Sequence, residues 1–148
     1  MEFFDTDRLS DGEISLVLER AREAEPARRR LPAYCFRICD SLGRTVGHCD
    51  LKIGYSDAIY YSGHIGYEID EPFRGRHYAA KACRLLFPLA KKHGMDRLYI
   101  SCRPDNLPSR RTCEYLGGEL LEIAELPADH DLRLEAGHTC ECIYRFML

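Results

Sequence analysis

The change of hydrophobic period around residue 75 constrains the fold of this chain most. Residues 63–69 read GHIGYEI, which is typical of a β-strand, whereas residues 76–93 place apolar side chains on one face of a helix. Gly75 lies in the turn between the two segments, and Gly94 marks the end of the helix. Pro88 falls inside the predicted helix and should kink it or loosen its last turn. This strand, turn and helix indicate an α/β fold.

The segments before this junction predict an antiparallel meander. Strands are expected at residues 33–39, 45–53 and 63–69, because a short turn joins the first two and a tyrosine-rich connection leads to the third. Residues 11–24 place apolar side chains among charged ones, in a pattern that predicts an amphipathic helix.

The segments after the junction complete a mixed sheet. Residues 97–101 predict a short strand of the kind that pairs in parallel after a crossover helix. Asn106 and Gly117 mark the start and the end of a second helix. Two last strands are expected at residues 118–123 and 141–146. The fold class is therefore a mixed α/β (α+β) sheet, antiparallel first and parallel at the crossover.

Length and charge exclude several classes of protein. A chain of 148 residues has the size of one domain, so we treat residues 1–148 as a single domain. The net charge of −3 leaves no basic excess to predict nucleic-acid binding. No apolar run approaches the roughly 18 residues of a membrane span, and the acidic N-terminus is unlike a signal peptide. We expect a cytoplasmic protein with no membrane or nucleic-acid partner, and we leave a homodimer open.

The cysteines fit a protein from a reducing compartment. All eight are irregularly spaced, and no Cys-x-x-Cys pair occurs. The nearest approach to a metal motif is the set His138, Cys140 and Cys142, which alternate along a predicted strand. A fourth ligand is not evident, so we interpret these residues as inward-facing strand residues and expect no metal site.

The strand–turn–helix junction is also a candidate anion site. The N-terminus of a helix exposes unpaired backbone N–H groups at its positive end, and a diphosphate suits such a place. Gly75 lets the backbone approach a ligand closely, while Arg74 and Arg76 add positive charge. About 30 residues later, Asn106 and Ser109 stand at the start of the second helix, where a capping pair would explain both without any function.

The two segments together resemble the GNAT superfamily of acyl-CoA-dependent N-acetyltransferases. The lead-in IGYEID is most similar to the branch that acetylates ribosomal-protein N-termini and related amines. The resemblance is strongest over residues 63–121, and it implies a first strand that is barely visible here, at Glu2–Phe4. The residues that carry it are Arg74, Gly75, Arg76, His77, Tyr78 and Ala79, followed by Asn106, Ser109 and the stretch EYLGG at residues 114–118.

The resemblance implies a GNAT-like fold with a V-shaped slot that holds acetyl-CoA as the acyl donor. In this family the strand at residues 63–69 splays away from its neighbour, and the pantetheine arm bonds to the strand's backbone, here at Tyr67 and Ile69. Asn106 and Ser109 would hold the pantetheine side of the slot. The pyrophosphate would sit on the N–H groups of Arg76, His77, Tyr78, Ala79 and Ala80.

Two positions depart from the family pattern. His77 replaces the first glycine of the usual loop, so it either takes a costly positive φ or keeps an ordinary conformation and lends charge to the phosphate. Cys113 stands where many members carry a tyrosine that acts as general acid toward the leaving thiolate. A thiol can donate that proton, but its pKa is close to that of the departing thiol, and water can serve instead.

The base that deprotonates the acceptor ammonium has two candidates. His64 lies on the predicted strand where several family members hold a catalytic carboxylate, and its ordinary pKa suits proton transfer. Glu68 lies on the same face, four residues along, either as base or as a contact for the substrate ammonium. A packed strand histidine and a solvent-exposed glutamate remain the structural alternatives.

The predicted function is transfer of an acetyl group from acetyl-CoA to a primary amine, by direct attack in a ternary complex. The acceptor is a small-molecule or peptide amine. The acidic stretch Glu122–Glu135 either attracts this amine or is a solvated loop, which is the usual meaning of such a run. The first alternative is a catalytically degenerate module that binds acyl-CoA without turnover. The second, outside the family, is a Cys/His metal protein.

Overall fold

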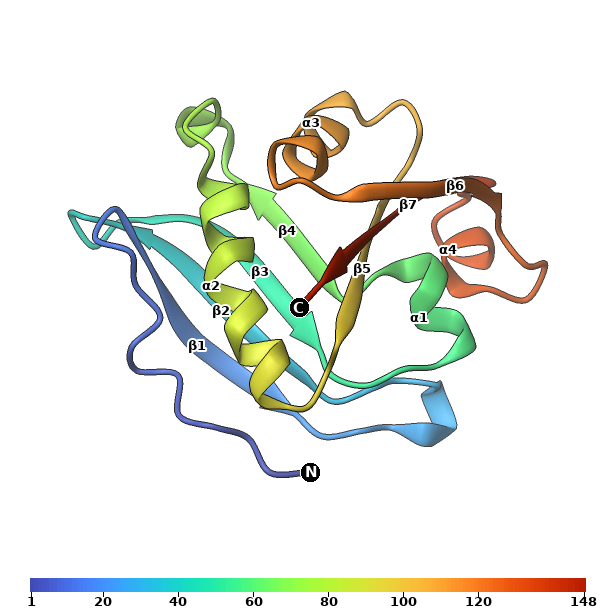
Figure 1. Cartoon of the computed structure of the whole chain (residues 1–148), viewed down its shortest axis with the longest axis horizontal. Coiled ribbons are helices and arrows are strands. Elements are labelled where there is room, and N and C mark those ends of the chain that lie inside the picture. The colour runs from blue at the N-terminus through green and yellow to red at the C-terminus, as the bar shows by residue number, and fades with distance from the viewer.

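The computed structural model describes all 148 residues, which form two antiparallel sheets with helices between and around them (Figure 1). The first sheet has the order β1-β2-β3-β4, with β1 at Ile14–Arg22, β2 at Ala33–Asp40, β3 at Thr45–Lys52 and β4 at Ile65–Ile69. The second has the order β5-β7-β6, with β5 at Arg97–Cys102, β6 at Glu119–Glu125 and β7 at Cys140–Met147. The predicted mixed α/β class and meander are confirmed.

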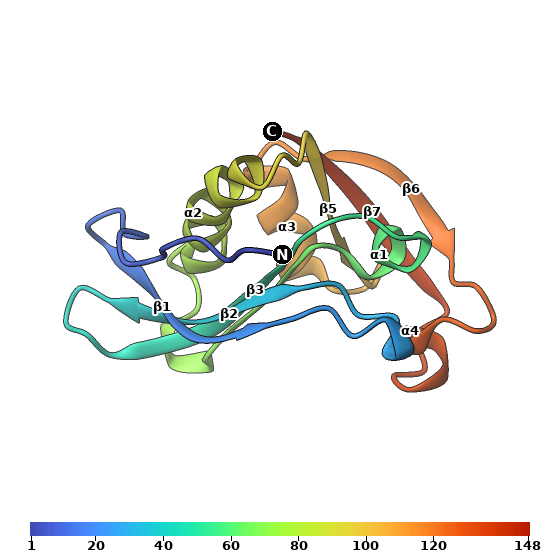
Figure 2. The ribbon, with the colours of Figure 1, turned by 90° about the horizontal axis from the view of Figure 1, so that it is seen from below.

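The helices connect and cover these sheets. α2 lies over the inner face of the first sheet, and the second sheet flanks it (Figure 2). Pro88 lies inside α2, as predicted. The four helices are α1 at Asp57–Ser62, α2 at Tyr78–Lys92, α3 at Leu107–Tyr115 and α4 at Asp131–Leu134, and short 3₁₀ turns occur at Pro26–Arg28 and Glu71–Phe73.

The prediction for the N-terminal segment is wrong, because residues 14–22 form a strand instead of a helix. β1 pairs with β2 along its whole length, from Ile14 opposite Asp40 to Arg22 opposite Ala33. Ile14 and Leu16 are buried with the alternation of a strand, whereas Leu18 is exposed. Pairing with β2, the next strand along the chain, outweighs the helix propensity of this segment. The expected strand at Glu2–Phe4 is absent, and the first strand of the sheet is β1.

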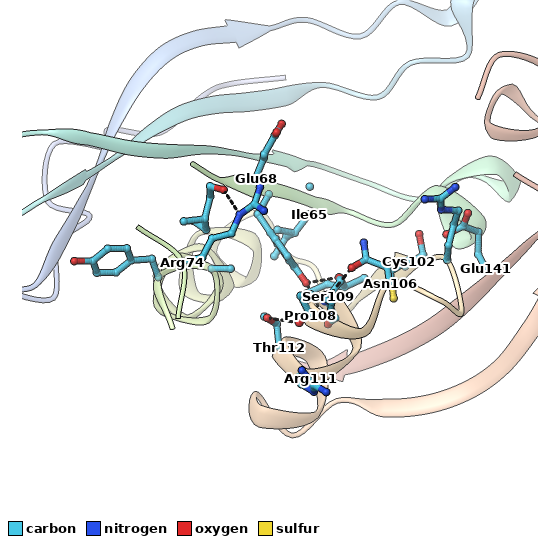
Figure 3. A pocket seen from close by; sticks show the side chains of 18 of the residues that line it. Ile65, Glu68, Arg74, Cys102, Asn106, Pro108, Ser109, Arg111, Thr112 and Glu141 are labelled. Carbon is cyan, nitrogen blue, oxygen red and sulfur yellow. Dashed lines mark hydrogen bonds between the residues drawn. The ribbon is translucent and has the colours of Figure 1, made fainter. Parts of the chain in front are cut away.

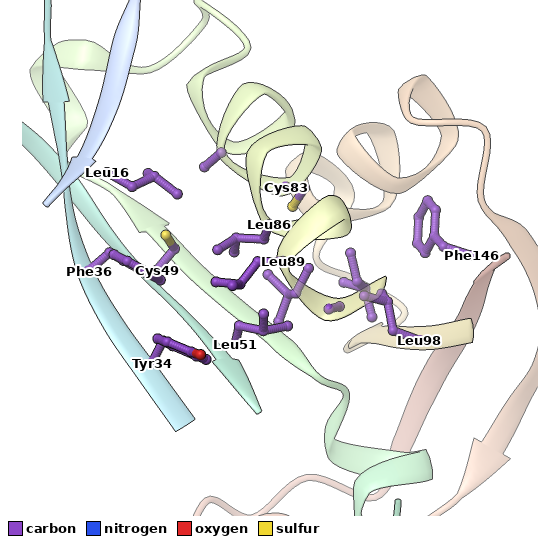
Figure 4. Close-up of a cluster of buried hydrophobic side chains, with 14 of the residues drawn as sticks. Leu16, Tyr34, Phe36, Cys49, Leu51, Cys83, Leu86, Leu89, Leu98 and Phe146 are labelled. Carbon is purple, nitrogen blue, oxygen red and sulfur yellow. The ribbon is translucent and has the colours of Figure 1, made fainter. Parts of the chain in front are cut away.

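The hydrophobic core lies between α2 and the two sheets (Figure 4). Leu16, Phe36 and Leu51 enter it from the first sheet, and Leu98 and Phe146 enter it from the second. α2 contributes a row of buried residues at helical spacing, which are Ala82, Cys83, Leu86, Leu89 and Ala90. All eight cysteines are free thiols.

β4 and β5 lie side by side at one end only, and this arrangement positions the site. Between these segments the backbone of His64 donates one hydrogen bond to Tyr99 O, at 2.6 Å, and the strands then separate toward α3 (Figure 1). Gly63 permits the close approach, because its φ is 79° and a Cβ there would lie 2.9 Å from Ser101 N. The predicted parallel pairing of residues 97–101 is therefore wrong: β5 forms its ladder with β7, antiparallel.

Candidate active site

The gap between β4 and β5 opens into a cavity of about 910 Å³ that the N-terminal ends of α2 and α3 close on one side (Figure 3). Most of the site residues expected from the sequence line it. They are Tyr67, Glu68, Ile69, Arg74, Gly75, His77, Tyr78, Ala79, Asn106 and Ser109. His64, Arg76, Ala80 and Cys113 are not among the lining residues.

One end of the cavity is built to receive an anion. The first backbone hydrogen bond of α2 runs from Lys81 N to His77 O, at 3.0 Å. No backbone acceptor meets the N–H groups of residues 76–80, which point out of the helix N-terminus. Arg74 lies beside them, where its Nε donates to Ile69 O at 2.8 Å. The helix dipole and the arginine both favour negative charge at this end.

His77 takes the left-handed backbone conformation. Its φ is 59°, which costs a residue with a side chain about 1–2 kcal/mol relative to the right-handed region. Its ring stacks on Tyr115, with the ring centroids 4.2 Å apart and the planes 17° from parallel. Of the two alternatives that the sequence left open, the structure therefore has the positive φ, and a stacked ring accompanies it.

The edge of β4 that faces the cavity carries unpaired main-chain groups. Asp70 N donates to Val46 O and Lys52 N donates to His64 O, so the even-numbered residues turn their main chain toward β3. The odd-numbered residues Tyr67 and Ile69 therefore turn their N–H and C=O groups toward the open side, where Ile69 O accepts from Arg74 Nε and the other groups have no strand partner. β5 pairs with β7 and leaves this edge free to bond an extended ligand.

Polar groups from β4 and α3 meet in the middle of the cavity. Asn106 caps α3, where its Oδ1 accepts from Ser109 N at 3.2 Å. The Tyr67 hydroxyl lies 2.7 Å from Ser109 Oγ, which joins the strand to the helix (Figure 3). Burial raises the pKa of Tyr67 above its ordinary value, so this hydroxyl stays protonated at neutral pH.

His64 lies behind the cavity, and its geometry argues against the expected role as base. The side chain is fully buried, with Nε2 2.7 Å from Gly54 O and Nδ1 accepting from Tyr99 N at 3.0 Å. Both ring nitrogens are therefore occupied by main-chain groups. Burial lowers the pKa of His64 to about 4, so the ring is neutral at pH 7. These contacts make His64 a link between the chain before α1 and β5.

The surroundings of Cys113 and Glu68 also differ from those that a general acid and a general base would need. Cys113 is buried under α3, and burial raises its pKa to about 12, which makes the thiol a poor donor at neutral pH. Glu68 is exposed, and its carboxylate points away from Ser109 in Figure 3. The side chains of β4 alternate, so Glu68 faces the opposite side of the sheet from Tyr67.

No sequence motif marked the far end of the cavity, which Glu141 of β7 and His138 line. The only sequence signal was the alternation of His138, Cys140 and Cys142, which we interpreted as inward-facing strand residues. No three His, Cys, Asp or Glu side chains gather as a metal ion would require. Instead His138 Nδ1 forms a hydrogen bond with Glu141 Oε1. Arg103 and Arg111 are further lining residues that no motif marked.

The open N–H groups at the α2 N-terminus and the free edge of β4 thus lie in one cavity. The family model for the acetyltransferase (GNAT) domain matches residues 1–119, and the chain belongs to this family. The resemblance noted in the sequence is thereby confirmed. No curated protein sequence matches it significantly.

Solved structures share this fold at low sequence identity. RimL, a ribosomal L7/L12 alpha-N-protein acetyltransferase, superposes with a TM-score of 0.58 at 21% identity, over 78% of this chain and 69% of that one. The microcin C7 self-immunity acetyltransferase MccE, in complex with acetyl-CoA and AMP, has a TM-score of 0.59 at 20% identity, over 78% and 61%. A Salmonella typhimurium enzyme that modifies the N-terminal serine of L7/L12 has a TM-score of 0.60 at 20% identity, over 82% and 66%. This chain thus spans less than two thirds of two of these three proteins.

None of its own helices is long and apolar enough to cross a bilayer.

Proposed function

We propose that this acetyltransferase binds acetyl-CoA in the cavity between β4 and β5 and transfers the acetyl group to a primary amine. One observation carries the proposal: the open N–H groups of α2 and the unpaired edge of β4 meet in one cavity. The first would hold a diphosphate and the second would hold the pantetheine arm. Structural neighbours that carry acetyl-CoA or act on ribosomal-protein N-termini support a peptide N-terminus as one acceptor class.

Each end of the cavity has a part in the proposed reaction. Arg74 and the N–H groups of residues 76–80 hold the diphosphate. The main chain of Tyr67 and Ile69 aligns the arm, and a backbone N–H of β4 polarises the thioester carbonyl. The amine nitrogen attacks the carbonyl carbon in a ternary complex, the carbon–sulfur bond breaks, and the thiolate takes the proton that the nitrogen loses.

A binding module without turnover is the second candidate, and the positions of two side chains favour it. His64 and Cys113, expected as base and acid, both lie outside the cavity lining. If no other group moves the protons, the chain would hold acetyl-CoA without transferring its acetyl group.

An acceptor screen separates the two candidates. The purified protein is given acetyl-CoA with peptides that begin with serine or alanine, with spermidine, with an aminoglycoside and with free amino acids. Release of free CoA and the mass of the acetylated amine are measured. We expect transfer to at least one amine; stable acetyl-CoA binding without transfer to any of them would favour the binding module.

A thermal-shift series tests the diphosphate site. CoA at a hundredfold excess over its Kd should stabilise the folded state by roughly 2.7 kcal/mol, and pantetheine at the same concentration should stabilise it much less. Arg74→Gln should weaken CoA binding and leave the pantetheine shift unchanged, because Arg74 lies beside the α2 N-terminus. Equal shifts with CoA and pantetheine would contradict the assignment.

A further inference from the structure

His138 and the buried Glu141 form a hydrogen-bonded pair at the end of the cavity that no part of the proposed CoA site occupies. Figure 3 shows Glu141 at the opposite end of the cavity from Arg74, with Ser109 between them. Glu141 stands on β7, and His138 lies in the loop just before it, held there by a hydrogen bond from its N–H to Leu132 O at 3.0 Å. An acceptor amine that meets the thioester from the side away from the diphosphate would enter here.

The hydrogen bonds of the pair leave one ring nitrogen free. His138 Nδ1 is bonded to Glu141 Oε1, and this is the only hydrogen bond that the His138 ring makes within the protein. The Glu141 side chain is 2% exposed, whereas that of His138 is 22% exposed. The carboxylate is thus enclosed behind an imidazole that reaches the cavity.

The neighbouring histidines are bonded differently. His64 uses both ring nitrogens on main-chain groups, and so does His130, through Ala58 O and Leu132 N. These two rings connect main-chain segments, and neither ring has a nitrogen free to accept a proton. Among the three, only His138 combines a carboxylate partner with a free nitrogen at a cavity wall.

We propose, on the basis of the proposed acetyltransferase function, that His138 Nε2 removes the proton from the acceptor ammonium and that Glu141 is its positioning residue. The carboxylate accepts from Nδ1–H, which leaves Nε2 as the basic nitrogen, and it stabilises the imidazolium that forms. The neutral amine then attacks the thioester carbon, and the carbon–sulfur bond breaks. The thiolate takes the second proton from the nitrogen, and His138 returns the first to water.

The surroundings of Glu141 suit this role. Burial raises its pKa, while His138, Arg103 and His130 act in the opposite direction. The thiols of Cys102 and Cys142 are the other titratable groups nearby, and burial raises the pKa of both, so they stay neutral at pH 7. The carboxylate therefore faces the Arg103 guanidinium, the two histidine rings and neutral thiols, and its negative charge attracts an acceptor ammonium.

The test compares His138→Gln, Glu141→Gln and the control His48→Gln, whose histidine is exposed on β3. The readout is the pH profile of kcat/KM with the best amine of the acceptor screen, together with CoA affinity and melting temperature. His138→Gln should lower kcat/KM by about 10²-fold or more at pH 7, and the loss should shrink as pH rises and the free amine becomes abundant. CoA affinity should stay within about twofold, because the pyrophosphate end lies across the cavity. His48→Gln should match the wild type.

Glu141→Gln should lower kcat and leave the KM for the amine nearly unchanged, because the imidazolium that forms during the reaction loses its carboxylate partner. Should this buried substitution prevent folding, the more exposed His138 still provides the decisive comparison. A folded His138→Gln variant within about threefold of wild-type kcat/KM, with an unchanged pH profile, would overturn the inference while leaving the acetyltransferase proposal intact. A wild-type protein that acetylates no amine would overturn that proposal first.

Discussion

Lowering the pH from 7 to 4 is expected to remove about 3 kcal/mol of unfolding free energy through His64 alone. Its pKa falls from 6.5 to about 4 on folding, and each unit is worth about 1.4 kcal/mol. Because the folded pKa lies below the unfolded one, the unfolded chain binds the extra proton between pH 6.5 and pH 4. Stability is thus full above pH 6.5 and falls as the pH drops through this window.

Urea unfolding at several pH values between 7 and 4 would measure this effect. His64→Gln should be less stable at pH 7, since it loses the bonds to Gly54 O and Tyr99 N, but its stability should depend less on pH. His48→Gln serves as the control, because that side chain is exposed, and it should keep the wild-type slope. Equal slopes for wild type and His64→Gln would refute the assignment.

Truncating Leu86 to alanine should destabilise the protein by about 2–5 kcal/mol. Leu86 is fully buried on α2, in the cluster that joins the two sheets (Figure 4). The substitution removes apolar contacts and leaves a cavity that the surrounding close-packed residues fill only in part. Because α2 also supplies the anion site, loosening its packing should weaken CoA binding as well.

Chemical denaturation of Leu86→Ala and of the control Leu42→Ala would measure the difference. Leu42 lies in the turn between β2 and β3 and is 75% exposed, so its truncation should change stability by at most about 0.5 kcal/mol. Comparable losses for the two variants would mean that the α2 cluster is not the centre of stability.

The sequence alone was enough to predict α2 and the turn that precedes it. Apolar residues at helical spacing, Gly75 before the helix and Gly94 after it are local signals, and each acts within one or two turns of chain. The anion end of the site follows from the same segment, because any helix N-terminus leaves N–H groups unpaired. Asn106 as the cap of α3 was predictable for the same reason.

The long-range pairings could not be read from the sequence. Residues 14–22 have a helix-like composition, and only their pairing with β2 makes them a strand. β5 was expected beside β4 in parallel, but β7, about 40 residues later, is its ladder partner. The separation that opens the cavity therefore depends on a strand at the other end of the chain.

The histidines illustrate a feature that the sequence did not determine and the tertiary structure did, namely which ring has a free nitrogen at the cavity. The sequence contains six histidines, and its position on a predicted strand made His64 a candidate for the general base. Packing buries that ring and bonds both of its nitrogens to the main chain, whereas it leaves Nε2 of His138 free beside a buried carboxylate. Local signals determined the helix that would hold the cofactor. Which side chains face the acceptor end was decided only by tertiary packing, because segments separated by dozens of residues meet there.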